Sequence, residues 1–484
     1  MNMTYDLKAL DAALAKRIEE KKLPGVTVCL RGPEGVIFEK GYGYCDENQR
    51  PINENTVMGI ASMSKSTVAL ALCILAAEGK ISMDDPVVKY LPTFRMPGSP
   101  VQDVTIHHLA THTAGIPPME PLEWSIAMNT PGRNEPDMQY LRSTSPNQMD
   151  TIEHIIDYIA EGKYPTLGGP GEYMSYSNEG YALMCYIVDA AAGVSLEQFL
   201  KDRVFGPMGM TRSVLDLDCS EAKAIASDGN ITRLWTRNED GTFEVDDKWG
   251  ILPPFRSCAC VKSTAHDMAR YYQCLSNHGV IDGVQVIPAA AADMMTGLQF
   301  PLQEKPYYCY GLNKRLWKGH VICEHSGGLH GVSTHGGFLK DENFGCAALC
   351  NEGGQDTDDL CWMMYNLVMG QPLEERHVWL RPTGETYQNP EMLEGTYVCH
   401  EGVPVYARFY QNEEGVLRME KFMYSIKTGK KIVLGDVKPV HCGGSWFQME
   451  DSTGARAGRL HFWVRHGKAW GVQVYSRIYT RVED

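Results

Sequence analysis

Residues 59–77 read GIASMSKSTVALALCILAA, and this stretch joins a polar start to a run of ten apolar residues that begins at Val68. A helix that is apolar on all its sides lies inside a protein, away from water. We therefore expect a buried central helix over about 60–77, with Ser62 and Lys65 near its N-terminal end.

The spacing Ser62-x-x-Lys65 predicts a nucleophile and its base. Residues three apart on a helix share a face, so Lys65 lies beside Ser62. A serine hydroxyl is a weak nucleophile until a neighbouring base takes its proton. A lysine takes that proton only when burial or nearby cations favour its neutral amine form, and the apolar helix supplies burial. The positive potential at the helix N-terminus also favours anions that develop on a substrate.

The chain contains a second Ser-x-x-Lys pattern, Ser220-Glu221-Ala222-Lys223. It falls in a polar stretch without periodicity, which is typical of an exposed loop. We interpret this copy as a solvated surface segment without a catalytic role.

A second motif is Tyr176-Ser177-Asn178. A phenol near a cation can shuttle protons, and the asparagine amide can bond both to Lys65 and to a substrate carbonyl. Two other Tyr-x-Asn patterns, at 387–389 and 410–412, lie in a linker and a strand-rich region, where turn or strand tyrosines are the simpler interpretation. The sequence therefore favours Tyr176 and Asn178 as site residues.

The third motif is His325-Ser326-Gly327-Gly328. Glycines at a strand edge let a ligand approach the backbone, and an exposed N–H there can complete an oxyanion hole with the N–H of Ser62. Lys427-Thr428-Gly429 is a rival, but two lysines follow it and a solvated hairpin turn explains it. Chain order and the strand-like runs that follow favour His325.

Periodicity divides the chain into a mixed α+β part and an all-β part. We expect long loops at 117–150 and 218–256. A stretch rich in proline and charge at 371–392 predicts a linker between a domain over 1–370 and an antiparallel β-barrel over 393–484. The expected elements of the first domain are helices at 5–22 and 357–369 and strands at Val26–Leu30, Val36–Glu39, Gly311–Trp317, Val332–Leu339 and Phe344–Cys350.

Composition excludes several classes of partner. The 484 residues carry a net charge of −15, which disfavours nucleic acid and anionic membrane surfaces. The 15 cysteines are scattered and odd in number, and no signal peptide is recognisable, so a cytoplasmic location is expected. No metal or cofactor is predicted, because His108 and His112 have the spacing of a ligand pair but lack a third ligand.

Four segments carry a resemblance to a known family. They are GIASMSK at 59–65, TIHHLATHTAGI at 105–116, PMGMT at 207–211 and STAHDM at 263–268. With these segments, residues 5–370 resemble the serine β-lactamase and penicillin-binding-protein superfamily, in particular its class C-like branch of esterases, D-aminopeptidases and related peptidases.

The resemblance implies a fold and a set of roles. The expected fold is a β-lactamase/transpeptidase-like domain, with a five-stranded antiparallel sheet flanked by helices and a helical lobe, followed by a lipocalin-like barrel. Ser62 would be acylated, Lys65 and Tyr176 would handle protons, and Asn178 would position the substrate. Gly328 would supply the second oxyanion N–H, while His325, Ser326 and Gly327 would line the substrate site.

One departure from the family concerns His325, where lactamases and transpeptidases usually carry lysine. Histidine, with an ordinary pKa near 6.5, is expected to change charge between about pH 5 and 8 and to hold an anion less firmly. This favours ester, amide or short-peptide substrates without a fixed carboxylate. His107, His330 and His335 are interpreted as structural or substrate-lining residues.

The sequence thus predicts a serine hydrolase of small-molecule esters, amides or short peptides. Two alternatives stay open. The same acyl-enzyme could pass its acyl group to an alcohol or amine, which would make the protein an acyltransferase. A protein of another class, a catalytically inactive binding protein, could keep the same fold.

Overall fold

The computed structural model describes residues 5–100, 102–297, 307–376, 380–454 and 456–482. The chain forms two compact units, which are described separately below. The first unit comprises Met1–Pro92, Thr105–Thr111 and Tyr181–His377. The second unit comprises Thr93–Val104, His112–Gly180 and Val378–Asp484.

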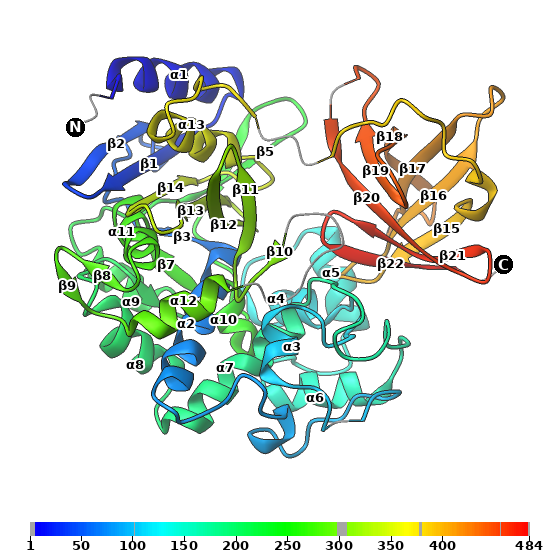
Figure 1. Cartoon of the computed structure of the whole chain (residues 1–484), viewed down its shortest axis with the longest axis horizontal. Helices are drawn as coiled ribbons and strands as arrows, with labels where there is room; N and C mark the ends of the chain where they lie inside the picture. Colours follow the sequence, from blue (N-terminus) through cyan, green and yellow to red (C-terminus); the bar gives the residue numbers. More distant parts are fainter. Residues whose placement is uncertain (1–4, 101, 298–306, 377–379, 455, 483–484) are drawn as a thin grey trace. The chain divides into compact units, whose positions relative to one another are not determined.

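A seven-stranded antiparallel sheet is the centre of the first unit (Figure 1). The predicted strands are all present, and the sheet has two more strands than the resemblance implies. In spatial order its strands are β10 (Tyr307–Tyr308), β11 (Asn313–Trp317), β12 (His320–Leu329), β13 (Val332–Leu339), β14 (Phe344–Cys350), β1 (Gly25–Gly32) and β2 (Gly35–Gly43).

Alternation along β1 explains how the sheet is covered on both faces. Val26, Val28 and Leu30 pack into one apolar cluster with helices α1 (Leu7–Glu20) and α13 (Asp358–Val368). Helix α11 (Ala265–Ser276) packs against β1, β13 and β14. It covers the other face so closely that a methyl group on Gly345 would lie 2.6 Å from the carbonyl oxygen of Ala269. Both helices predicted from the sequence at this layer, α1 and α13, are confirmed.

The predicted central helix is present and buried. A 3-10 turn over Ala61–Met63 leads into α2 (Ser64–Ala77), in which every residue from Ser64 to Leu75 is buried. Helices α8 (Leu196–Leu200), α10 (Arg256–Ala259) and α12 (Ala289–Thr296) pack around it. Lys65 is therefore surrounded by protein on the first turn of a helix that could not be exposed without a large hydrophobic cost.

A closed eight-stranded antiparallel barrel belongs to the second unit. Its interior is apolar and aromatic, with Tyr397, Phe409, Phe447 and Phe462 almost fully buried. The barrel confirms the predicted all-β part, whereas the boundaries 1–370, 371–392 and 393–484 stay predictions. Its strands are β15 (Gly395–Cys399), β16 (Val405–Gln411), β17 (Leu417–Tyr424), β18 (Lys431–His441), β19 (Trp446–Glu450), β20 (Arg456–Arg465), β21 (Lys468–Val474) and β22 (Arg477–Arg481).

Two predicted loops contain regular structure. Residues 117–150 include α4 (Pro121–Asn129) and α5 (Pro136–Thr144), and each helix begins with proline at its first position, where the missing N–H costs nothing. Residues 218–256 include α9 (Ser220–Ile225) and the hairpin β5 (Leu234–Arg237) with β6 (Phe243–Asp246). In the first of these segments, a proline at the first position of a helix has the same sequence signal as a proline in a loop.

The remaining helices and strands are short, apart from the helices over Ile152–Glu161 and Asn178–Ala192. They are α3 (Ile106–Ala110), α6 (Ile152–Glu161), α7 (Asn178–Ala192), β3 (Met58–Gly59), β4 (Val214–Leu215), β7 (Val261–Ser263), β8 (Val280–Ile281) and β9 (Val284–Gln285). Within the described ranges no single helix is long and apolar enough to span a membrane. The bent pair Asn178–Ala192 and Leu196–Phe205 together has the length and composition of a membrane span, and no other property supports one.

Candidate active site

Ser62 and Lys65 are in hydrogen-bonding contact in the first unit. The Lys65 Nζ lies 3.2 Å from Ser62 Oγ and 3.3 Å from the carbonyl oxygen of Cys258. The centroid of the Tyr181 ring lies 5.8 Å from the same nitrogen. Lys65 is fully buried, whereas Ser62 is partly exposed. A buried base thus faces a nucleophile that a substrate can reach, as the spacing of the motif predicted.

The backbone before Ser62 is held in an unusual conformation. Ala61 has a φ of +46°, a left-handed value that is uncommon for a residue with a side chain. On its N-terminal side, the N–H of Ile60 donates to the carbonyl of Val261 at 3.0 Å, and the Ile60 carbonyl accepts from Thr334 Oγ1 at 2.9 Å. Strand β13 therefore fixes the turn that presents the nucleophile, the kind of strain that surrounding structure must hold in place.

The third motif lies at an edge of the sheet beside this turn. In the described part of the sheet, the pairing of β11 with β12 extends from His320 as far as Glu324, and the third motif follows directly after it. A methyl group on Gly327 would lie 2.4 Å from the carbonyl oxygen of Ile60, while one on Gly328 would meet nothing within 4 Å. The strand therefore approaches the nucleophile turn as closely as glycine allows, and its edge remains open at Gly328.

His325 is buried between Tyr308 and its own strand. Its Nδ1 donates to the carbonyl of Ser326 at 2.5 Å, so Nε2 accepts from the Tyr308 hydroxyl at 3.2 Å. Burial, with a contribution from the charge of Lys65, lowers the pKa of His325 to about 3. The expectation that His325 changes charge between pH 5 and 8 is therefore wrong, because the ring is neutral throughout that range.

The second motif lies in the second unit, where the barrel contacts it. The Tyr176 N–H donates to the carbonyl of Ser476 at 2.8 Å, and the guanidinium of Arg477 lies 4.8 Å from the Tyr176 ring. The Asn178 amide donates to Glu401 Oε1 at 2.7 Å, and Arg477 pairs with the same carboxylate. Barrel residues thus bind both side chains of the Tyr-x-Asn motif.

Glu401 and Arg477 could not be predicted from the sequence. They lie more than 200 residues after the motif they contact, and in the sequence each is one charged residue among many in a β-rich segment. The structure brings Ser62, Lys65 and the third motif together within one unit. That Tyr176 and Asn178 join them stays a prediction.

The rival motifs have the surroundings of ordinary surface residues. Ser220 and Lys223 lie on the short helix α9 rather than in irregular chain, and both are exposed. Residues 427–429 form the exposed turn between β17 and β18, closed by a hydrogen bond from the Gly429 N–H to the Ser425 carbonyl. Neither motif has the burial that Lys65 has.

The histidine pair considered for a metal serves local structure. The Nδ1 of His108 accepts from the Thr105 N–H and caps α3, and the Nδ1 of His112 accepts from the Ser177 N–H. Among the residues that the structure describes, one group, Cys29, Glu39 and His266, has ligand atoms close enough to share an ion. It lies on β1, β2 and α11 and includes no residue of the three motifs.

Comparison with known proteins identifies the family. The family model described as Beta-lactamase matches residues 10–363, so the chain belongs to the beta-lactamase family. Penicillin-binding protein 4* of Bacillus subtilis is 28% identical over 196 residues, which cover 40% of this chain and 38% of that protein. Esterase EstB of Burkholderia gladioli is 36% identical over 110 residues, 22% of this chain and 28% of that protein. The matched stretches span little more than a third of these relatives or less.

Solved structures share the fold. The octameric penicillin-binding protein homologue from Pyrococcus abyssi superposes with a TM-score of 0.67 at 22% identity, covering 98% of this chain and 99% of that one. The D-amino acid amidase from Ochrobactrum anthropi has a TM-score of 0.59 at 20% identity, covering 75% and 99%. The predicted fold class is confirmed, including the C-terminal barrel.

A pair of glycine variants tests the approach of the third motif to the nucleophile. Gly327→Ala should slow the labelling of Ser62 by a fluorophosphonate about 100-fold, because the new methyl group must push the strand or the Ile60 carbonyl aside. The matched variant Gly328→Ala has open space and should label at a rate much closer to that of the wild type. Equal effects of the two changes would contradict this geometry.

The neutral state of His325 predicts a pH-dependent loss of stability. Its pKa in the folded protein is about 3, below the ordinary value of 6.5. The stabilisation that comes from keeping the ring neutral is therefore complete above pH 6.5 and is lost as the pH falls. Between pH 7 and pH 5 the wild type should lose about 2 kcal/mol of unfolding free energy more than His325→Asn does. Denaturant titrations at both pH values measure the difference, and parallel losses in the two proteins would show that His325 is not held neutral.

Proposed function

We propose that this protein hydrolyses ester, amide or short-peptide bonds of small molecules through an acyl-enzyme on Ser62. The observation that carries the proposal is the contact between Ser62 Oγ and the buried Nζ of Lys65. Membership of the beta-lactamase family supports it. The coarser conclusion, a beta-lactamase-related serine hydrolase, agrees with the relatives that are named as an esterase and an amidase.

The proposed reaction has two stages. The Ser62 oxygen attacks the substrate carbonyl as Lys65 takes its proton, and the N–H groups of Ser62 and Gly328 bind the resulting oxyanion. The intermediate then expels the leaving alcohol or amine, to which Tyr176 passes the proton from Lys65. In the second stage water attacks the acyl-enzyme, and Lys65 and Tyr176 again transfer the proton. The carboxylic acid is released and the Ser62 oxygen regains its proton.

The state of His325 bears on the substrate class. A neutral, buried ring on the same strand as Gly328 provides no fixed cation for a carboxylate of the substrate. This favours esters and amides over penicillins, which carry a carboxylate. A hydrolysis screen over acyl esters, amino-acid amides of both chiralities and a chromogenic cephalosporin tests the order of preference.

Acyl transfer is the alternative that uses the same intermediate. An alcohol or amine would replace water in the second stage and leave every earlier step unchanged. Product analysis with and without a nucleophilic acceptor separates the two reactions, because a transferase forms the new ester or amide in preference to the free acid.

An inactive binding protein is the alternative of another class. It would keep the fold while lacking a reactive serine. The contact between Ser62 and Lys65 argues against it, and a fluorophosphonate, which modifies activated serines, distinguishes the two.

Replacement of the nucleophile gives the most direct prediction of the proposal. Ser62→Ala should abolish fluorophosphonate labelling and lower turnover on the order of 10⁴-fold or more, with an unchanged melting temperature. Ser220→Ala, in the exposed copy of the motif, is the matched control and should behave like the wild type. Labelling that survives in Ser62→Ala and disappears in Ser220→Ala would reverse the assignment.

A double mutant tests whether Tyr176 works with Lys65. Lys65→Ala and Tyr176→Phe should each slow acylation strongly, and the double variant should be about as slow as the worse single one, because both belong to one proton-transfer unit. Single-turnover acylation rates of the four proteins complete the cycle. Additive effects would mean that the two residues act independently.

A further inference from the structure

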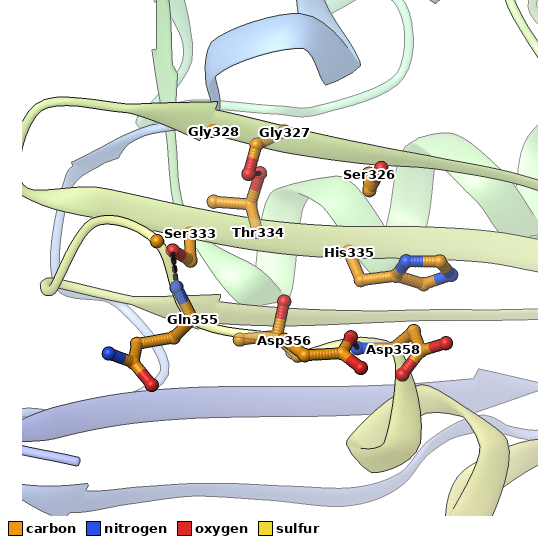
Figure 2. Close-up of a pocket in the computed structure, with 11 residues that line it drawn as sticks. Ser326, Gly327, Gly328, Ser333, Thr334, His335, Gln355, Asp356 and Asp358 are labelled. Carbon is orange, nitrogen blue, oxygen red and sulfur yellow. Dashed lines mark hydrogen bonds between the residues drawn. The ribbon is translucent and has the colours of Figure 1, made fainter. Parts of the chain in front are cut away.

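The residues proposed for the reaction come from both units of the chain. Ser62 and Lys65 belong to the first unit, as does the third motif, in which Gly327 of β12 pairs with Thr334 of β13 (Figure 2). Asn178 belongs to the second unit, together with all the strands of the barrel. The contacts between Asn178 and the barrel therefore lie within one unit, and they determine which groups this side chain can offer.

Two parts of the barrel bind the segment of the second motif. The Ile478 N–H of β22 donates to Ser175 Oγ at 3.2 Å. Asn178 Nδ2 donates to Glu401 Oε1 at 2.7 Å, and Glu401 lies in the loop between β15 and β16. The motif is thus bound by a strand at one point and by a loop at the other.

Close packing holds the loop that carries Glu401. Gly402 has a φ of +78°, a value that favours glycine, and a methyl group there would lie 2.8 Å from Glu123 Cγ of α4. Since α4 belongs to the same unit, the loop has little room to move away from the motif.

Glu401 also forms an ion pair. Arg477 Nη2 donates to Glu401 Oε1 at 2.6 Å, and the Nε of the same guanidinium contacts Oε2. The side chain of Glu401 is 19% exposed and that of Arg477 is 27% exposed, so water reaches the pair only in part. A guanidinium that contacts both oxygens holds the plane of a carboxylate in one orientation. Glu401 therefore faces Asn178 as an acceptor in a fixed place.

Two other carboxyl groups lie near this pair. Burial, with a contribution from the charge of Glu401, raises the pKa of Glu179 to about 8 and that of Glu123 to about 7. Both groups hold a proton for much of the time near neutral pH. The negative charge beside Arg477 is therefore carried mainly by Glu401.

The carboxylate decides which end of the Asn178 amide faces the barrel. A carboxylate contains acceptors only, whereas an amide has a donating NH₂ group and an accepting oxygen. Nδ2 of Asn178 must therefore face Glu401, and Oδ1 is turned away from it. Asn178 is 5% exposed, so a reversed amide would leave two buried acceptors in contact, which costs stability.

We propose that Glu401 is a positioning residue for the reaction at Ser62, which holds the amide of Asn178 so that an acceptor is presented to the substrate. This role rests on the proposed function, in which Asn178 positions the substrate. A reversed amide would present a donor instead. The barrel thus takes part in the reaction through a residue that touches neither the substrate nor the reacting atoms.

Glu401→Gln tests this role while keeping the size of the side chain. Glutamine can donate as well as accept, so Asn178 can take either orientation. For the fastest substrate among acyl esters and amino-acid amides, kcat/KM should fall about tenfold. Fluorophosphonate labelling should stay near the wild-type rate, because Ser62 and Lys65 keep their contact. The matched control is Glu420→Gln, an equally exposed barrel glutamate paired with Lys431, and it should match the wild type in both measurements.

An exchange of the two groups provides a rescue. Asn178→Asp alone places two carboxylates in contact and should lower kcat/KM about 100-fold. When Glu401→Gln is added, a donor from the barrel again meets an acceptor at residue 178, whose second oxygen is turned away from the barrel. The double variant should therefore recover about tenfold of the lost kcat/KM. A double variant that folds, as judged by its melting temperature, and shows no recovery overturns the positioning role.

The outcomes separate this role from the proposed function. A wild type that neither turns over nor reacts with a fluorophosphonate overturns the proposed function. An active wild type with equal kcat/KM in Glu401→Gln and Glu420→Gln overturns the positioning role alone. Parallel losses of labelling and turnover in Glu401→Gln also overturn it, because they indicate general damage to the protein. If Asn178→Asp does not fold, the comparison of the two glutamine variants decides.

Discussion

The chemistry proposed for this protein depends on the hydrogen bond between the buried amine of Lys65 and the hydroxyl of Ser62. The bond exists because a helix that is apolar on every side carries Lys65 into the interior on its first turn. The Cys258 carbonyl accepts from the same amine, and the left-handed Ala61 turns the chain so that Ser62 stays accessible. Strand β12 can approach this turn only because residue 327 is glycine.

Much of the fold could be predicted from local pattern. The buried helix, the amphipathic helix at the N-terminus and the strands of the main sheet follow from periodicity, because each has a single apolar face or no polar face at all. Helices α4 and α5 were missed because they are nine residues long and start at proline, so their signals resemble those of a loop. The short helix α9 was missed for lack of a clear apolar stripe.

Some features of the candidate site could also be predicted from the sequence, and others could not. Ser62, Lys65 and the glycines of the third motif could be found from spacing, since the chemistry needs them close together in sequence or at a strand edge. The neutrality of His325 could not, because it arises from burial and from contact with Tyr308. Glu401 could not either, because its carboxylate reaches Asn178 from a barrel loop 223 residues away. Tertiary burial and long-range contacts, rather than residue type, set these properties.

We expect Ser62 to carry the acyl group during turnover. Rapid mixing of the wild type with an ester substrate, followed by an acid quench and mass analysis of proteolytic peptides, measures it directly. The acyl mass should appear on the peptide containing Ser62 and should decay at least as fast as the product forms. An acyl group on another residue, or an adduct on Ser62 that decays more slowly than turnover, would contradict it.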